Sequence, residues 1–94
     1  MSLPIILAAE EDPDVLGVVK TQLVERYAHD YRVMCLSDPG VALRKLTELA
    51  DAGQDVALVL AQMPRLAIAG AGLLERVREL HPHAKRALLV PPNV

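Results

Sequence analysis

The stretch PIILAAEEDPD, residues 4–14, carries the signal that decides the fold. Residues 4–9 form a short apolar run, which predicts a strand that is covered on both faces of a sheet. Asp12 can then cap free backbone N–H groups, and Pro13 suits the first helical position because its missing N–H would be unpaired there anyway. A buried strand that passes directly into a capped helix indicates a protein that alternates strands and helices.

The same alternation continues along the rest of the chain. Ser37, Asp38 and Pro39 repeat the start signal, and Gly53 can close the helix that follows because glycine adopts positive φ at low cost. We expect strands at residues 4–9, 32–36, 56–61 and 87–90, with Lys85 and Arg86 ahead of the last one. We expect helices at about residues 13–27, 39–53 and 69–81. The order βαβαβαβ predicts a parallel sheet with covering helices.

Apolar residues at helical spacing predict which face of each helix meets the sheet. For the first helix the predicted stripe is Val15, Val18, Val19 and Leu23. For the second helix it is Leu43, Leu46, Leu49 and Ala50, and for the third Leu73, Leu74, Val77 and Leu80.

The bulk composition limits the class of protein and its partners. With 94 residues, 52% hydrophobic and 23% charged, we expect one globular domain over residues 1–94 and a modest core. A net charge of -2 and only two aromatic residues, Tyr27 and Tyr31, argue against nucleic-acid binding. Residues 3–9 are too few to span a bilayer, so we expect no membrane segment. Cys35, the single cysteine, excludes an internal disulfide and fits a cytoplasmic location.

Four segments together resemble the receiver domain of two-component response regulators. They are ILAAEEDP, LSDPGVALRKL, VALVLAQ and LLERVRELHPHAKRALLV. The phrase HDYRV adds a similarity to receivers fused to thioredoxin-reductase-like modules. The resemblance implies an α/β, flavodoxin-like three-layer fold with a parallel sheet. Receivers continue through a further helix, a fifth strand and a fifth helix, so we expect an incomplete domain that is truncated after strand four.

The resemblance also implies a site beyond the carboxyl ends of the strands, where a receiver holds Mg²⁺ and accepts a phosphoryl group on an aspartate. Glu10 and Glu11 match the acidic, metal-binding pair. A gapless alignment through VLAQMPRLAIAGAGLLE places Gln62 on the phospho-acceptor position, and Val90 falls where the family has a hydroxyl residue. The lysine of the fifth strand has no counterpart, and Lys85 lies at the wrong end of its strand to replace it.

Two interpretations of these site positions stay open. Adjacent glutamates after a strand commonly lie in a solvated loop, where their charge favours a helix start by about 0.3–1 kcal/mol. The alternative for Glu10 and Glu11 is a Mg²⁺ or Ca²⁺ site, of weak affinity because Gln62 supplies no third carboxylate. We therefore expect no cofactor beyond weakly held Mg²⁺. Gln62 is either an ordinary structural amide or a permanent mimic of a neutralised acceptor.

The remaining chemistry-bearing residues favour structural roles. His29, His81 and His83 lack a nearby set of metal ligands, and the helix dipole favours a histidine at the helix end near His81. Cys35 is expected to be a small buried hydrophobe. The AGAG segment at residues 69–72 lacks the third glycine of a dinucleotide-binding turn, so it indicates a loop that enters a helix.

These observations predict a protein that is not an enzyme. The leading hypothesis is a pseudo-receiver that takes up no phosphate and acts through a protein partner or a second copy of itself, as a homodimer. A homodimer would cover the apolar surface and strand edge that the absent helices and strand leave open. One alternative is the N-terminal regulatory domain of a larger redox or nucleotide-dependent enzyme. Another is an active phospho-receiver of a phosphorelay that uses a different acid, such as Asp12.

Overall fold

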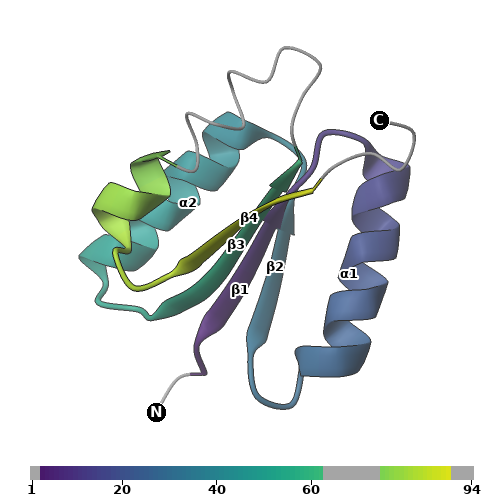
Figure 1. Cartoon of the computed structure of the whole chain (residues 1–94), viewed down its shortest axis with the longest axis horizontal. Coiled ribbons are helices and arrows are strands. Elements are labelled where there is room, and N and C mark those ends of the chain that lie inside the picture. The colour runs from purple at the N-terminus through teal and green to yellow at the C-terminus, as the bar shows by residue number, and fades with distance from the viewer. Residues whose placement is uncertain (1–2, 63–74, 90–94) are drawn as a thin grey trace.

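The computed structural model describes residues 3–62 and 75–89, and these residues form a four-stranded parallel sheet (Figure 1). The strands are β1 (Ile5–Ala9), β2 (Arg32–Leu36), β3 (Val56–Gln62) and β4 (Lys85–Leu89), in the order β2-β1-β3-β4. The helices are α1 (Pro13–Tyr27), α2 (Pro39–Asp51) and the helical residues 75–80. The predicted α/β, flavodoxin-like arrangement is confirmed.

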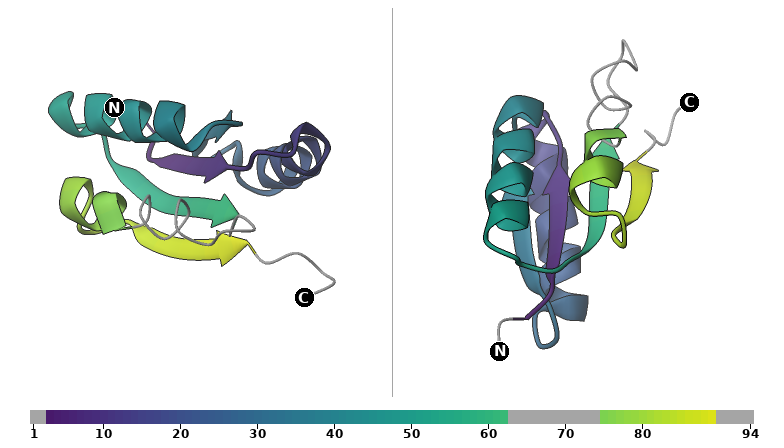
Figure 2. Two further views of the ribbon diagram at one scale, coloured as in Figure 1. Left: turned by 90° about the horizontal axis from the view of Figure 1, so that it is seen from above. Right: turned by 90° about the vertical axis from the view of Figure 1, so that its left-hand side faces the viewer.

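The helices form two layers on opposite faces of the sheet. Figures 1 and 2 show α1 on one face, and α2 together with residues 75–80 on the other. Side chains of β1 alternate between these faces, as the period of a strand requires. Ile5 and Leu7 belong to the core on the α2 side, whereas Ile6 and Ala8 belong to the core on the α1 side.

Both helix starts form as the sequence predicts. A side-chain oxygen of Asp12 accepts hydrogen bonds from the backbone N–H groups of Asp14 and Val15, at 2.9 and 3.4 Å. The Asp38 side chain does the same for Gly40 and Val41, at 2.7 and 3.3 Å. Each aspartate therefore replaces helical partners that the first turn cannot provide, and each is followed by proline at the first helical position.

The end of α2 is closed by Gly53, which has a φ of 70°. Its N–H donates to the carbonyl of Ala50 at 3.1 Å, and the next N–H, of Gln54, donates to the carbonyl of Leu49 at 2.9 Å. This pair of bonds reverses the chain with the last carbonyls satisfied and directs it into β3. The positive φ is the reason that glycine is needed at this position.

The two faces of the sheet are packed unequally. On the α2 side, buried residues from β1, α2, β3, residues 75–80 and the turn before β4 form a continuous core, with Leu46, Val59 and Val77 fully enclosed. Leu43 and Leu80 pack against it, so the predicted faces of α2 and of residues 75–80 are confirmed where the chain is described. On the α1 side the fully buried cluster of the described residues is Ile6, Ala8 and Leu23 alone. The α2 side therefore holds most of the core.

The predicted stripe of α1 is wrong in part. Leu23 is buried and Val19 packs beside it, but Val15 and Val18 are exposed, Val18 to 59%. The inward face instead includes the half-buried Leu16. Apolar residues surround much of this helix, so their spacing alone does not define which side faces the sheet.

Five boundaries differ from the predictions by one or two residues. β1 begins at Ile5 instead of residue 4, and α2 ends at Asp51 instead of residue 53. β4 begins at Lys85, two residues before the expected Ala87. Its place at the edge of the sheet explains the difference, because an edge strand tolerates charged side chains that a central strand excludes. β3 extends one residue further, to Gln62, and the last helical residue before β4 is Leu80. Leu73 and Leu74 of the predicted third stripe lie outside the described residues.

The two aromatic residues lie together at the corner between α1 and β2. Tyr27 is the last residue of α1, and its ring meets that of Tyr31 edge to face, with centroids 6.0 Å apart and an angle of 89° between the planes. This is a favoured geometry for an aromatic pair, because the positive edge of one ring meets the negative face of the other. Tyr31 also packs against the cluster on the α1 side.

Candidate functional site

The carboxyl ends of β1 and β3 meet at one edge of the sheet, as the predicted site requires. Ala9 pairs with Ala61, so the next residues, Glu10 and Gln62, leave these neighbouring strands side by side. Gln62 is also paired with Leu89 of β4. The structure therefore places the backbone of the predicted acceptor position between β1 and β4, at the carboxyl end of the sheet, where open α/β sheets bind their ligands.

Glu10 is not in a solvated loop, and that interpretation of the residue is wrong. Only 2% of Glu10 is exposed, and its Oε1 accepts the backbone N–H of Asp12 at 2.9 Å. Its own N–H donates to the carbonyl of Leu36 at 3.0 Å, which ties the β1 exit to the end of β2. A buried carboxylate needs such partners because burial alone strongly disfavours the charge. Glu10 therefore fixes the turn from β1 into α1.

The neighbouring acidic residues turn away or are already used. Glu11 is exposed. Asp12 is the cap of α1, so the alternative of Asp12 as an acceptor would cost the helix its first-turn partner. The described residues contain no group of three His, Cys, Asp or Glu side chains that could hold a metal ion. One buried, hydrogen-bonded glutamate beside an exposed one fits Mg²⁺ poorly, since this ion needs a near-octahedral shell of oxygen ligands.

Two further positions complete the comparison with the predicted site. Val90 lies outside the described residues. Lys85 pairs with Leu58 at the start of β4, whereas Gln62 pairs with Leu89 at its end. A strand rises about 3.3 Å per residue, so the backbone of Lys85 is roughly 13 Å from the site edge. The prediction that Lys85 lies at the wrong end of the strand is confirmed.

The histidines divide into one buried and two exposed residues. His29 and His83 are exposed, in line with a structural or surface role. His81 is 7% exposed, and its Nε2 lies 2.8 Å from the backbone carbonyl of Leu46 in α2. A carbonyl oxygen only accepts, so Nε2 carries the hydrogen and donates it. His81 thus joins the end of the helical residues 75–80 to the middle of α2.

Cys35 was expected to be a small buried hydrophobe, and it is half-buried. It packs at the margin of the cluster on the α1 side. Burial raises the pKa of the Cys35 thiol, and the positive charge of Lys20 offsets part of this effect. The neutral thiol is a poor nucleophile, so Cys35 has no sign of a reactive role. The AGAG segment lies outside the described residues.

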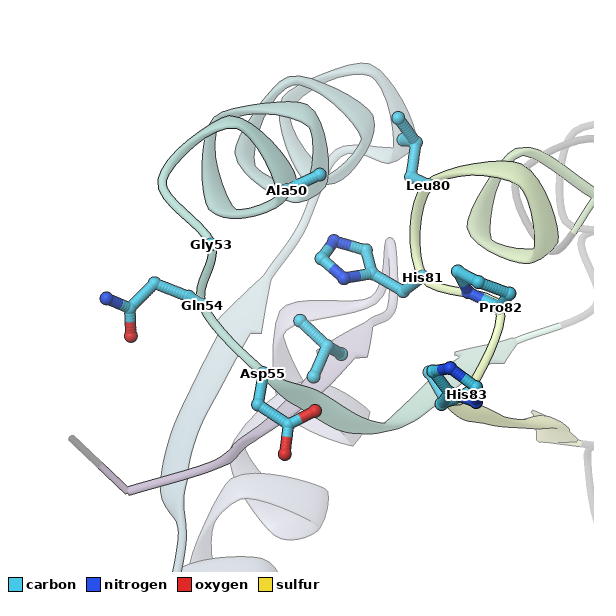
Figure 3. A pocket seen from close by; sticks show the side chains of 10 residues that line it. Ala50, Gly53, Gln54, Asp55, Leu80, His81, Pro82 and His83 are labelled. Atoms are coloured by element: carbon cyan, nitrogen blue, oxygen red, sulfur yellow. The ribbon is translucent and has the colours of Figure 1, made fainter. Parts of the chain in front are cut away.

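One feature was not predicted from the sequence: a cavity at the end of the sheet where β3 and β4 begin, opposite the end that holds Glu10 and Gln62. It is lined by the end of α2, the loop into β3 and the turn before β4, and His81 and Asp55 both border it (Figure 3). Residues 50–56 and 80–84 are far apart in the chain, and no local motif links them. The cavity therefore could not be predicted from local sequence, because it forms only where these two loops come together in the folded chain.

Comparison with solved structures identifies the fold. The crystal structure of the signal receiver domain of an HD domain-containing protein from Pseudomonas fluorescens Pf-5 superposes with a TM-score of 0.72 and 26% identity, over 96% of this chain and 66% of that one. The chain has the receiver fold. The receiver domain of the hybrid histidine kinase CckA matches with a TM-score of 0.66 and 23% identity, over 94% of this chain and 85% of that one.

This receiver fold spans just under two thirds of the Pseudomonas receiver chain to which it is similar. No protein-family model matches the sequence, and neither does any curated protein. The likeness to receivers therefore rests on the fold. None of the described helices is both long enough and apolar enough to cross a membrane.

Proposed function

We propose that this chain is a receiver-fold regulatory module that takes up no phosphoryl group and acts by binding protein surfaces. One observation carries the proposal: Gln62 is the last residue of β3, at the edge where Glu10 leaves β1. A phosphoryl acceptor at this position must be a nucleophilic carboxylate. The side chain of Gln62 ends in a neutral amide, which lacks the negative charge that makes a carboxylate nucleophilic. The proposal assigns the chain no enzymatic step.

The surrounding acids support the same conclusion. Asp12 and Asp38 each use a side-chain oxygen to cap a helix, and Glu10 is buried with a bond to the Asp12 N–H. Making one of these residues the acceptor would remove a hydrogen bond that holds its loop. The loss of an aspartate cap costs about 1 kcal/mol. The active-receiver alternative therefore has no acid in place of Gln62 among the described residues.

Phosphorylation of the intact chain tests this directly. Incubation with acetyl phosphate and Mg²⁺, followed by intact-mass measurement, should leave the mass unchanged. A gain of one phosphoryl group that hydroxylamine removes would overturn the proposal, because hydroxylamine cleaves acyl phosphates. Gln62→Asp is the informative companion variant, because it restores the carboxylate without lengthening the side chain. If that variant gains a phosphoryl group and the original chain does not, the amide at residue 62 is the reason that the original chain is not phosphorylated.

We further propose that the bound surface is the α1 side of the sheet and that a second copy of the chain covers it. This face has the smaller buried cluster, while Leu58 and Leu60 on β3 are only half-buried there. Val15 and Val18 are exposed on α1, and residues three apart lie on the same side of a helix. Apolar surface of this kind favours a protein contact over water.

The outer edge of β4, the last strand of the sheet among the described residues, is the less suitable contact. Lys85 and Arg86 are exposed at its start, and charged residues on an edge strand discourage the addition of another strand. Pairing through the α1 side needs no such charged strand in the contact, so it is preferred over strand addition.

Light scattering after size-exclusion chromatography tests the dimer. The original chain should elute as a dimer at high concentration and dissociate on dilution. Val18→Lys should shift it toward the monomer, because the new charge would be buried in the contact. Val41→Lys is the matched control: Val41 is an exposed valine on α2, over the other face, and its replacement should leave the dimer intact. A monomer at every concentration, or equal effects of both variants, would contradict the α1-side contact.

A second candidate function is a regulatory domain within a larger protein, such as a redox or nucleotide-dependent enzyme. The two solved structures compared above are described as receiver domains of larger proteins, an HD domain-containing protein and a hybrid histidine kinase. An antibody raised against this chain would detect the native protein in extracts. A native product longer than these 94 residues would favour this candidate, and a product of the same length would exclude it.

A further inference from the structure

The cavity at the amino ends of β3 and β4 has the features of a binding site and is separate from the edge that holds Glu10 and Gln62. Its volume is about 250 Å³. Sites for drug-sized ligands measure roughly 300–1,000 Å³, so this one suits a single functional group or side chain better than a cofactor. We infer that it binds an organic cation, an ammonium or guanidinium group with N–H donors.

Two chain reversals build the cavity from opposite sides. The Gly53 turn at the end of α2 brings Gln54 and Asp55 to its wall. After residues 75–80, the N–H of Ala84 donates to the carbonyl of His81 at 3.0 Å, and the turn so formed supplies the other wall. Both walls are held by backbone hydrogen bonds, so the cavity is part of the folded framework.

His81 provides a hydrogen-bond acceptor inside this framework. Its Nε2–H is committed to the carbonyl of Leu46, so in the neutral ring Nδ1 has a lone pair and accepts. Figure 3 shows this second nitrogen on the side of the ring that faces Asp55 and away from α2. Of the two ring nitrogens of His81, only Nε2 forms a hydrogen bond with a described residue. Among the described residues, every fully buried side-chain nitrogen or oxygen has a partner, so the unbonded Nδ1 is not fully buried. Because His81 lines the cavity, a ligand reaches Nδ1 from there.

The charges around the cavity favour a cation. Asp55 is an exposed acidic residue that lines the cavity, and the lining residues include neither lysine nor arginine. The C-terminal end of α2 also lies here, and a helix end of this polarity favours a positive charge. An anion would be repelled by all of these groups. Metal ions are a poor fit, because the described residues hold no cluster of three ligating side chains.

A titration of isotope-labelled protein with agmatine, followed by NMR, tests the site. Agmatine carries both a guanidinium and an ammonium group, and we expect it to shift the resonances of His81, Asp55 and their neighbours with a Kd on the order of millimolar. Butylurea is the neutral control, with a similar shape and N–H donors but no charge. Equal shifts from butylurea, or no shifts at the cavity from agmatine, would overturn the inference.

Matched variants separate the site from general attraction between opposite charges. Asp55→Asn removes the rim carboxylate and should weaken agmatine binding by about three- to fivefold, the upper range for an exposed ion pair. Asp51→Asn removes the same charge at the last residue of α2, which does not line the cavity, and should leave the affinity unchanged. Equal losses in both variants would show that the chain attracts cations without a defined site.

A second arm distinguishes a free small molecule from a side chain of a partner. A short peptide with one arginine is compared with the same peptide carrying citrulline, which keeps the shape but not the charge. Tighter binding of the arginine peptide than of agmatine would indicate a partner's arginine as the natural ligand. Equal or weaker binding would indicate a small cation. Binding of the citrulline peptide as tightly as the arginine peptide would refute the cation site.

Discussion

His81 is the best place to test how the helical residues 75–80 are held on the sheet. Its ring donates to the carbonyl of Leu46, a link between residues 35 positions apart. His81→Phe keeps a flat ring of similar size and removes the donor. Inside a helix the Leu46 carbonyl also accepts the N–H four residues on, so it does not become an orphan. The cost should therefore be that of one net hydrogen bond, about 1 kcal/mol, and not the larger penalty of an unsatisfied buried group.

The assay is thermal and urea unfolding with three variants in parallel. For a domain of this size, a loss of 1 kcal/mol lowers Tm by about 4–8 °C. His81→Gln should lose less than His81→Phe, because its amide can again donate to Leu46. His83→Phe is the control, since His83 is exposed and should change stability by less than about 0.5 kcal/mol. If His81→Phe is as stable as the original chain, the bond contributes nothing and the reasoning fails.

Four further expectations follow from the described geometry. Gly53→Ala should lose about 1–2 kcal/mol in urea unfolding, because a side chain is strained at a φ of 70° even where space is free; an unchanged midpoint would contradict the assigned conformation. Gly17→Ala, inside α1 and also in open space, should instead gain about 0.5–1 kcal/mol. Asp12→Ala should lose about 1 kcal/mol through the missing cap, and retention of full stability would show that solvent replaces it. Burial raises the pKa of Cys35, so its alkylation by iodoacetamide should need a higher pH in the folded chain than in the urea-unfolded chain. The free energy of unfolding should fall as the pH rises from the unfolded to the folded pKa of the thiol. Equal alkylation rates in the folded and unfolded chains at one pH would refute this.

The sequence predicted best those elements whose boundaries depend on local chemistry. Asp12 with Pro13, and Asp38 with Pro39, set helix starts within a few residues of chain, and the structure has both. Gly53 ends α2 for an equally local reason. The apolar runs of the strands predicted the parallel sheet, because an alternating order of strands and helices leaves few other arrangements.

The errors concern residues whose environment depends on distant parts of the chain. Val18 was expected to face inward, but apolar residues surround α1 and only the sheet decides which of them it covers. Lys85 was expected ahead of β4, but it is the first residue of that strand, whose edge position tolerates the charge. Glu10 looked like a solvated residue, because its burial depends on the neighbouring end of β2. The role of His81 depends on Leu46, which no local pattern connects to it.

At the candidate site, topology was predictable and side-chain chemistry only in part. The register that brings Gln62 beside the exit of β1 follows from a parallel sheet with strands in this order. The resemblance to receivers supplied the proposed meaning of that position, a phospho-acceptor position occupied by an amide. The cavity near Asp55 required the coordinates, since two separate chain reversals form it.

The edge-to-face pair of Tyr27 and Tyr31 determines what an optical experiment on this molecule reports. The chain has no tryptophan, so its near-ultraviolet emission comes from these two rings alone. Both sit at the junction of α1 and β2, away from the larger core beneath α2. Tyrosine emission therefore reports the local unfolding of the junction between α1 and β2, while circular dichroism reports the unfolding of the whole backbone. A gap between the two signals would mean that this corner opens first.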